Sequence, residues 1–477
     1  MGRGERYPIV ITALVAGAYY MEMLDATVIA TALPQMARSF GTNAVNLSSG
    51  MSAYVLALAV FIPISGWTAD RLGARTVFST AIAVFTASSV LCGFSNNVWQ
   101  FTAARLVQGL GGAMMVPVGR LVVLNNTEKK DLMRAIACLT WPALLAPVLG
   151  PPLGGFITTY ANWRWIFFIN VPVGIAAYVL AWIFVPNDQP EGKPSLDVTG
   201  FLLSGAGCTT LMYGLEMLAK ENSSWLLAAL LIVIGLGICA AAVRHAQRHP
   251  KPLLNIAALK LPTFAVAIVG GSAFRIAINA VPFVTPLMFQ IGFGMSAFQS
   301  GLLLLALFAG NVAMKPFTTP LLRRFGFRTL LNYNGVLVVA GIVACVWLTP
   351  NTPRIIIMAT LFFGGLTRSM QYTNFNTIGF ADVPKAGLSG ANTFFATVQQ
   401  MSVAMGIALG AVALKTSMLI HGNKSGRLTM ADFPLAFIFV SVIAMTALLD
   451  SLRLHPEAGA VVSGRSAPLG KTAESSP

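Results

Sequence analysis

The stretch YYMEMLDATVIATALPQ, residues 19–35, places two acids inside an apolar run that begins near Pro8. An ionised carboxylate in the core of a bilayer costs at least about 2.5–3.5 kcal/mol, even on a lenient insertion scale. Glu22 and Asp25 are three residues apart, so on a helix they share one face. Two acids on one face of a membrane helix indicate a functional role, because intramembrane acids are rare and face the interior of a bundle.

The composition of the whole chain is that of a membrane protein. Of its 477 residues, 56% are hydrophobic and 10% are charged, whereas a soluble domain has about 25% charged residues. Apolar runs of roughly 20 residues, each long enough to cross a bilayer as a helix, recur along the chain. We therefore expect an all-α polytopic membrane protein. Fourteen spans are predicted, centred near Gly17, Leu58, Phe85, Gly112, Val148, Ile175, Gly207, Ile232, Ile276, Ala306, Val338, Phe363, Met405 and Val442.

The basic residues predict how the chain is oriented in the membrane. Most of the 31 Lys and Arg residues fall in the even-numbered loops and at the two ends of the chain. By the positive-inside rule, both termini are then expected in the cytoplasm. This topology and contact with anionic lipid explain the net charge of +15. Nucleic-acid binding is not expected, because the basic residues are scattered rather than clustered on one face.

Two loop segments have similar sequences. DRLGART at residues 70–76 and RRFGFRT at residues 323–329 share Arg, Gly, Arg and Thr at equivalent positions. Transporters are commonly built from such repeats, with the site near the midplane between them. The domains expected are an N-terminal six-helix bundle in residues 1–186, two inserted helices and a linker in 187–262, a C-terminal six-helix bundle in 263–455 and a disordered tail in 456–477.

Five motifs occur in order along the chain. They are LDATVIATALP at residues 24–34, GWTADRLGART at 66–76, RLVQG at 105–109, LGPPLGG at 149–155 and WRWIFFINVPVG at 163–174. Together they resemble the signatures of the major facilitator superfamily, specifically its 14-span drug:proton antiporter branch of the EmrB and QacA type and, within it, the MdtD-like group. The resemblance implies the major facilitator fold, secondary transport rather than enzymatic catalysis, and protons as the coupling ion with no other cofactor.

The first-span acids are the main candidates for proton coupling. Burial favours the neutral form of a carboxyl, so a buried carboxyl can exchange a proton near neutral pH. The resemblance implies a coupling and substrate role for Asp25 and a role in proton transfer for Arg105. For Arg105 the alternative is a static salt bridge between helices. Glu22 is less typical of the branch, and is either a second proton carrier or the partner of a basic residue.

The C-terminal half offers cations instead of acids. The repeat maps Glu22 onto Arg275, and Arg368 lies in span twelve. If both arginines pair with Glu22 and Asp25, the cavity is nearly neutral and suits diverse lipophilic compounds. If one arginine stays free, its guanidinium suits bidentate capture of a carboxylate. The expected substrate contacts are Gln108, Arg275, Arg368, Gln371, Asn392 and Gln399.

Glycines and prolines mark the elements that are expected to move. The glycines of span five permit close helix approach, and its prolines favour a bend. The resemblance implies that the charged loop after span two is an interhelix latch. The expected gating residues are Gly66, Asp70, Arg71, Gly73, Arg75, Gly150, Pro151, Gly154 and Gly155.

The expected function is proton-driven export of small molecules, namely multidrug or lipophilic compounds, across the cytoplasmic membrane by alternating access. The alternatives are export of an organic anion, such as a carboxylate metabolite or its metal chelate, and a transport-inactive membrane sensor. The sequence contains no G-x-x-x-x-G-K-[ST] loop, so direct coupling to ATP is unsupported. No metal site is expected. The expected partners are the substrate and the lipid bilayer, and the chain is expected to act as a monomer.

Overall fold

The computed structural model describes residues 3–127, 132–186, 196–220, 223–250, 252–384, 387–422, 427–455 and 458–459, and the elements in these ranges are helices. The predicted disordered tail therefore lies outside the described residues, apart from residues 458 and 459. The N-terminal half contains α1 (Arg3–Val28), α2 (Leu33–Phe40), α3 (Ser48–Phe61), α4 (Ser65–Leu72), α5 (Ala74–Phe94), α6 (Val98–Asn125), α7 (Leu132–Tyr160), α8 (Trp165–Phe168) and α9 (Asn170–Phe184).

Two helices follow before the second half begins. They are α10 (Val198–Ala219) and α11 (Trp225–Arg248), and Asp197 and Ser224 cap their N-termini. The C-terminal half contains α12 (Pro262–Leu287), α13 (Ala297–Ala313), α14 (Lys315–Phe325), α15 (Phe327–Ala344), α16 (Arg354–Ile378), α17 (Leu388–Ile420) and α18 (Asp432–Ser451). Short 3-10 turns, among them η1 (Ile29–Thr31), η2 (Ala44–Leu47) and η3 (Ile62–Ile64), and a π-turn, η5 (Met288–Gly292), join or extend these helices.

The long helices match the predicted spans. Each of the fourteen predicted centres falls in a different helix. Within the described residues, eleven helices are long and apolar enough to cross a membrane, or twelve if α13 and α14, which are bent by 48°, form one span. The other two, α7 and α16, are 29 and 25 residues long and pack against α1 and α13 respectively. The chain is a multi-span membrane protein.

The two halves are packed in the same way. In the N-terminal half α1 packs on α7, α3 on α6 and α5 on α9; in the C-terminal half α12 packs on α17, α13 on α16 and α15 on α18. The two similar segments, residues 70–76 and 323–329, also have similar backbone conformations, because Gly73 (φ 86°) and Gly326 (φ 78°) each end one helix and begin the next. Side chains rarely adopt such positive φ angles, so both loops need glycine at this position. The sequence repeat is thus a structural repeat.

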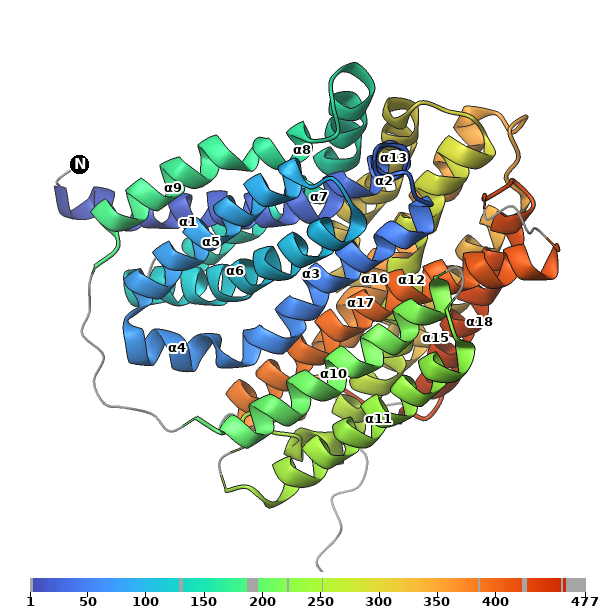
Figure 1. Ribbon diagram of the computed structural model, residues 1–477. Coiled ribbons are helices and arrows are strands. Elements are labelled where there is room, and N and C mark those ends of the chain that lie inside the picture. Colours follow the sequence, from blue (N-terminus) through green and yellow to red (C-terminus); the bar gives the residue numbers. More distant parts are fainter. Residues whose placement is uncertain are drawn as a thin grey trace, which may run out of the picture.

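The halves meet along two helix pairs. α7 packs on α13, and α3 packs on α17. Gln290 donates to the carbonyl of Thr31 at 3.0 Å, which adds a polar contact between the halves. α10 contacts both α3 and α17 and so covers this seam, while α11 packs on α10 at the periphery (Figure 1). The inserted helices therefore flank the junction of the bundles rather than forming a separate unit.

Candidate proton-coupling site

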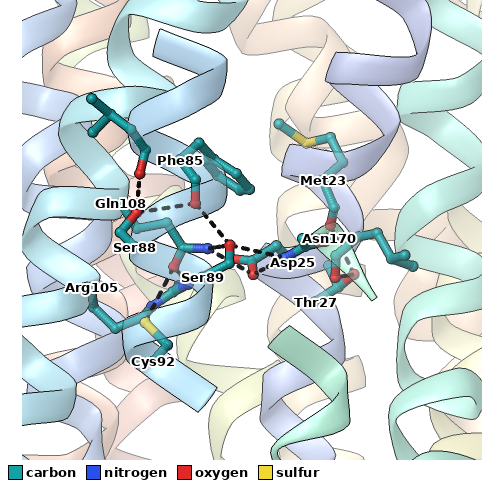
Figure 2. A network of polar contacts seen from close by, with 12 residues as sticks. Met23, Asp25, Thr27, Phe85, Ser88, Ser89, Cys92, Arg105, Gln108 and Asn170 are labelled. Atoms are coloured by element: carbon teal, nitrogen blue, oxygen red, sulfur yellow. Dashed lines mark hydrogen bonds and ion pairs between the residues drawn. The ribbon is translucent and has the colours of Figure 1, made fainter. Parts of the chain in front are cut away.

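The site is assembled by four helices of the N-terminal bundle. Asp25 lies on α1, Ser89 on α5, Arg105 and Gln108 on α6, and Asn170 at the start of α9. Figure 2 shows their polar groups converging on the carboxylate. All five residues are almost completely buried: Asp25 and Arg105 are each 1% exposed. Arg105 and Gln108, one turn apart on α6, both contact Asp25.

The carboxylate of Asp25 accepts three hydrogen bonds. Arg105 Nη1 donates to Oδ2 at 2.5 Å, and Gln108 Nε2 and Asn170 Nδ2 donate to Oδ1 at 3.0 and 2.9 Å. Arg105 Nη1 also donates to Gln108 Oε1 at 2.6 Å. The guanidinium lies over the ring of Tyr54, with 4.1 Å between its central carbon and the ring centroid. The ionised form of Asp25 is therefore fully satisfied without water, as a buried charge requires.

Two members of this cluster were not among the predicted site residues. Asn170 belongs to the motif WRWIFFINVPVG, in which it is the one amide, and that polar residue in an apolar segment was the available signal. Ser89 Oγ accepts from Gln108 Nε2 at 2.8 Å and from Asn170 Nδ2 at 3.4 Å. A serine in an apolar helix gives no such signal, because it can bond to its own backbone. Only the packing of α5 against α6 and α9 reveals its role.

Glu22 lies one turn before Asp25 and is 3% exposed. Its Oε2 atom has no hydrogen-bond partner among the described residues. Its Oε1 atom and the Tyr54 hydroxyl both lie beside Gly112 of α6, where a Cβ atom would be 3.5 and 3.1 Å from them. Glycine at this position leaves room for the Leu58 side chain and the Tyr54 hydroxyl, both 3.1 Å from such a Cβ atom, whereas contact with Glu22 would be an ordinary one. No ion pair of Glu22 is present in the described structure, so the predicted pairing with a basic residue is not seen.

Arg275, which is buried, and Arg368, which is partly buried, have no acid partners among the described residues. Arg275, which is 1% exposed, donates to the carbonyl of Ala267 at 3.2 Å and to Asn376 Oδ1 at 2.9 Å. Arg368 donates to the carbonyl of Ile278 at 3.2 Å. Of the two alternatives, pairing of both arginines with Glu22 and Asp25 is not seen among the described residues, and Asp25 pairs with Arg105 instead.

The remaining predicted substrate contacts fall into two groups. Gln108 and Gln371 are bonded inside the bundles: Gln371 Nε2 donates to the carbonyl of Leu331 at 3.0 Å, and its Oε1 accepts from Asn334 at 2.8 Å. On α17, Asn392 is exposed and Gln399 is partly exposed. The structure therefore does not gather these residues around one point, and their role in substrate binding stays a prediction.

The glycines of α7 lie where helices approach most closely. A Cβ atom at Gly150 would collide with the Thr27 side chain, and one at Gly154 with the carbonyl oxygen of Val28, both on α1. A Cβ atom at Gly155 would collide with the carbonyl oxygen of Ala297 on α13 of the other bundle. Reciprocally, Gly301 of α13 abuts the carbonyl of Pro151. The motif therefore joins the helix that carries Asp25 to the opposite half of the molecule.

The motif at residues 66–76 covers most of α4 and the start of α5, so Asp70 and Arg71, which were expected in a loop, lie in the last turn of α4. Asp70 and Arg71 are exposed, and Arg71 lies over Trp67 with 5.3 Å to the ring centroid. Arg75 lies over Trp182 of α9 at 4.4 Å. In the part of the chain that the structure describes, Asp70 forms no ion pair, so the interhelix latch stays a prediction. The contact between Arg75 and Trp182 does link the start of α5 to the end of α9.

One group of side chains has the spacing of metal ligands. Candidate ligand atoms of Asp197, His245 and His249 lie within 4.8 Å of one another. Burial alone would raise the pKa of Asp197, but hydrogen bonds from the Gly200 amide, His245 and the Leu253 amide lower it. Both carboxylate oxygens are thereby occupied: Oδ1 accepts from Gly200 and contacts His245, and Oδ2 accepts from Leu253. Capping of α10 and anchoring of the following linker account for Asp197.

The sequence matches known proteins over most of its length. The model of the Major Facilitator Superfamily matches residues 15–407. The multidrug resistance protein MdtD of Serratia proteamaculans (strain 568) is 35% identical over 409 residues, which cover 84% of each chain. The protein of that name from Pectobacterium carotovorum subsp. carotovorum (strain PC1) is 33% identical over 445 residues, or 91% of this chain and 94% of the relative.

Solved structures share the fold at low sequence identity. A D-xylose-proton symporter superposes with a TM-score of 0.66 at 13% identity, covering 95% of this chain and 98% of that one. A bacterial homologue of the human lysosomal transporter Spinster, in an inward-facing and occupied conformation, also has a TM-score of 0.66 at 13% identity and covers 98% of both chains. Fold, family model and relatives agree, and the chain is not an enzyme but belongs to the major facilitator superfamily of membrane transporters.

Proposed function

We propose that this protein is a proton-coupled antiporter that exports small lipophilic compounds across the cytoplasmic membrane, with both termini in the cytoplasm. The observation that carries the proposal is the buried ion pair of Asp25 and Arg105, which joins α1 to α6 in the interior of the first bundle. The relatives named as multidrug resistance proteins support the substrate class.

A proton on Asp25 would change the contacts between helices. In its ionised form the carboxylate holds Arg105, Gln108 and Asn170, and so draws α1, α6 and α9 together. A neutral carboxyl attracts the guanidinium far less and, as a donor, no longer suits three incoming donors. Arg105 would keep its bond to Gln108 Oε1 while α1 is released.

The movement of α1 would reach the other bundle through α7. At Gly150 and Gly154 the helix α7 packs directly on α1, and at Gly155 it packs directly on α13. Contacts this close leave little room for independent motion of the three helices. Protonation at Asp25 would therefore bias the packing of α7 against α13, which is one of the two seams between the halves. This is the coupling that alternating access requires.

Everted membrane vesicles test the proposal. A fluorescent lipophilic substrate should accumulate in energised vesicles that contain the protein, and an uncoupler should abolish the accumulation. Asp25→Asn should reduce accumulation to the background of vesicles without the protein, because asparagine keeps the shape but cannot carry the proton. Asp450→Asn is the matched control: its amide oxygen can still accept from the Gly270 amide, which Asp450 bonds at 2.9 Å at the end of α18.

Two results would contradict the proposal. Accumulation by Asp25→Asn at the wild-type level would assign the coupling to another group, with Glu22 the next to examine. An absence of uphill transport for every compound in a drug and metabolite screen would favour a membrane sensor on the transporter fold.

A second candidate is export of an organic anion, and the two unpaired arginines favour it. Arg275 and Arg368 are held by neutral oxygens, so their charges are not compensated by acids of the described residues. A carboxylate metabolite or its metal chelate would supply that compensation. Export of a lipophilic cation and of a tricarboxylate should be compared in Arg275→Gln and Arg368→Gln. Selective loss of tricarboxylate export supports this candidate, and an absence of tricarboxylate export by the wild type excludes it.

A further inference from the structure

A cavity of about 550 Å³ lies outside the site described above, between α3, α6 and the inserted helix α10. Its lining comes from the first turns of α3 and α6 and the last turns of α10, so it lies at the end of the bundle where α1 finishes. The polar part of its lining includes Ser49, Ser52, Thr102, Tyr213, Glu216 and Lys220. None of these residues belongs to the Asp25 cluster.

Glu216 is a buried carboxyl that the protein itself satisfies only in part. The residue is 7% exposed, and its Oε2 atom accepts a hydrogen bond from Ser48 Oγ at 3.0 Å. Its Oε1 atom and the neighbouring Ser52 Oγ have no hydrogen-bond partners among the described residues. A buried carboxylate oxygen without a donor is strongly unfavourable. Glu216 and Ser52 both line the cavity, so a ligand with N–H donors that displaces the Ser52 side chain could supply the missing donor.

Lys220 lies one turn beyond Glu216 on the same edge of the cavity. Its Nζ atom is 4.8 Å from the ring centroid of Trp99 and 5.9 Å from that of Tyr213. Among the described residues it forms no ion pair with Glu216, so the two charges remain separate. Trp99 and Tyr213 are 69% and 47% exposed. Exposed Trp and Tyr at the end of membrane helices are typical of the level of lipid headgroups.

We propose that this cavity binds the headgroup of a phospholipid that carries phosphoethanolamine. The primary ammonium would donate to Glu216 Oε1, and the phosphate would accept from Lys220 Nζ. A lipophilic cation would satisfy Glu216 but would meet the charge of Lys220, and an anionic headgroup would meet the charge of Glu216. A zwitterion with the two charges a few ångströms apart complements both residues. This inference concerns a lipid site and does not rest on the proposed transport function.

The position of the cavity gives such a lipid a structural role. α10 covers the seam between the bundles and contacts both α3 and α17. A headgroup bound between α10 and the first turns of α3 and α6 would fasten α10 to the N-terminal bundle. The bound lipid would then stabilise the packing of α10 at the junction of the bundles, and this stabilisation would be lost when the lipid dissociates.

Native mass spectrometry of the purified, delipidated full-length protein tests the site. The probes are phosphatidylethanolamine, phosphatidylcholine, which has the same phosphate but no N–H donor, and phosphatidylglycerol, which has no cation. The wild type should bind phosphatidylethanolamine about tenfold more tightly than either of the others, as expected for one charge-assisted contact. Glu216→Gln should remove the preference over phosphatidylcholine, and Lys220→Gln should weaken the binding of both zwitterionic lipids.

Two further variants separate the site from general effects on folding. Ser52→Leu should fill the cavity and weaken binding without removing a charge. Asp450→Asn and Lys260→Gln, which change the same kinds of charge elsewhere, should leave the preference unchanged. Equal binding of phosphatidylethanolamine and phosphatidylcholine by the wild type, or an unchanged preference in Glu216→Gln, would overturn the proposal. Displacement of phosphatidylethanolamine by a lipophilic cation that depends on Glu216 would also overturn it, and would assign the cavity to a cationic compound.

Discussion

The interiors of the two bundles differ although their helices pack alike. In the N-terminal bundle the buried guanidinium of Arg105 meets a carboxylate, and two amides complete that carboxylate's bonding. In the C-terminal bundle the guanidinium of Arg275 meets a carbonyl and an amide oxygen, and lies 4.6 Å from the ring centroid of Phe395. One half therefore holds a closed ion pair, and the other holds a positive charge that neutral groups solvate.

This difference indicates that the two halves of the repeated fold have different roles. A proton can neutralise the carboxylate of an ion pair and so change the contact between two helices, but it cannot change a guanidinium, which stays charged in proteins. The first bundle can therefore respond to protons, whereas the second presents a nearly constant positive charge. The stability and transport of matched variants in the two halves test this difference in roles.

The largest effect on stability is expected for Arg105→Met. The change leaves Asp25 as a buried carboxylate without its cation, and breaking a buried pair in this way costs about 3–5 kcal/mol. The free energy of unfolding, measured by titration with SDS in mixed micelles, should fall by about that amount. The double variant with Asp25→Asn should recover most of the loss but not the transport. An unchanged free energy of unfolding in Arg105→Met would contradict a buried ion pair between Arg105 and Asp25.

Gly154→Leu should abolish transport through a different mechanism. The new side chain would collide with the carbonyl of Val28, so α7 must move away from α1. Overpacking of this kind costs about 1–3 kcal/mol. The control is Gly237→Leu on α11, where a Cβ atom has no neighbour within 4 Å. Export in vesicles and the unfolding free energy should both fall in the first variant only, and normal export by it would exclude close packing of α1 and α7 as a requirement.

Arg275→Met should have the opposite effect on stability from Arg105→Met. Removing a buried charge that has no acid partner removes its desolvation penalty, so the unfolding free energy should rise by about 1 kcal/mol. The same SDS titration measures it. A loss as large as that of Arg105→Met would show that Arg275 does have a compensating partner, and the proposed difference between the bundles would fail.

The smallest effect is expected for Ser89→Ala. This change removes an acceptor of Gln108 and Asn170 but leaves the ion pair intact, so it should cost about 0.5–1.5 kcal/mol. Ser88→Ala is the matched control, because Ser88 bonds only to carbonyls of its own helix among the described contacts. If Ser89→Ala and Ser88→Ala are equally stable and equally active in vesicles, Ser89 does not position the amides.

The spans, the repeat and the main charged residues of the site could be predicted from the sequence. Long apolar runs leave a membrane helix as their one low-energy state, because every backbone polar group must be satisfied within the bilayer. Asp25 and Arg105 were identified because charges are rare in such runs. The sequence left open whether Glu22 and Asp25 pair with Arg275 and Arg368. In the structure Asp25 pairs with Arg105 on the neighbouring helix α6.

What the sequence determined by itself was local: which segments cross the membrane, where glycine is needed at Gly73 and Gly326, and which buried positions carry charge. What the tertiary structure decided was which groups share a hydrogen bond. Ser89 and Asn170 are 81 residues apart in the chain and join at one carboxylate cluster, and Glu216 faces a cavity whose other wall is α6. Hydrogen bonds act over about 3 Å, so they depend on the rotation and spacing of packed helices, which the pattern of apolar residues alone does not specify.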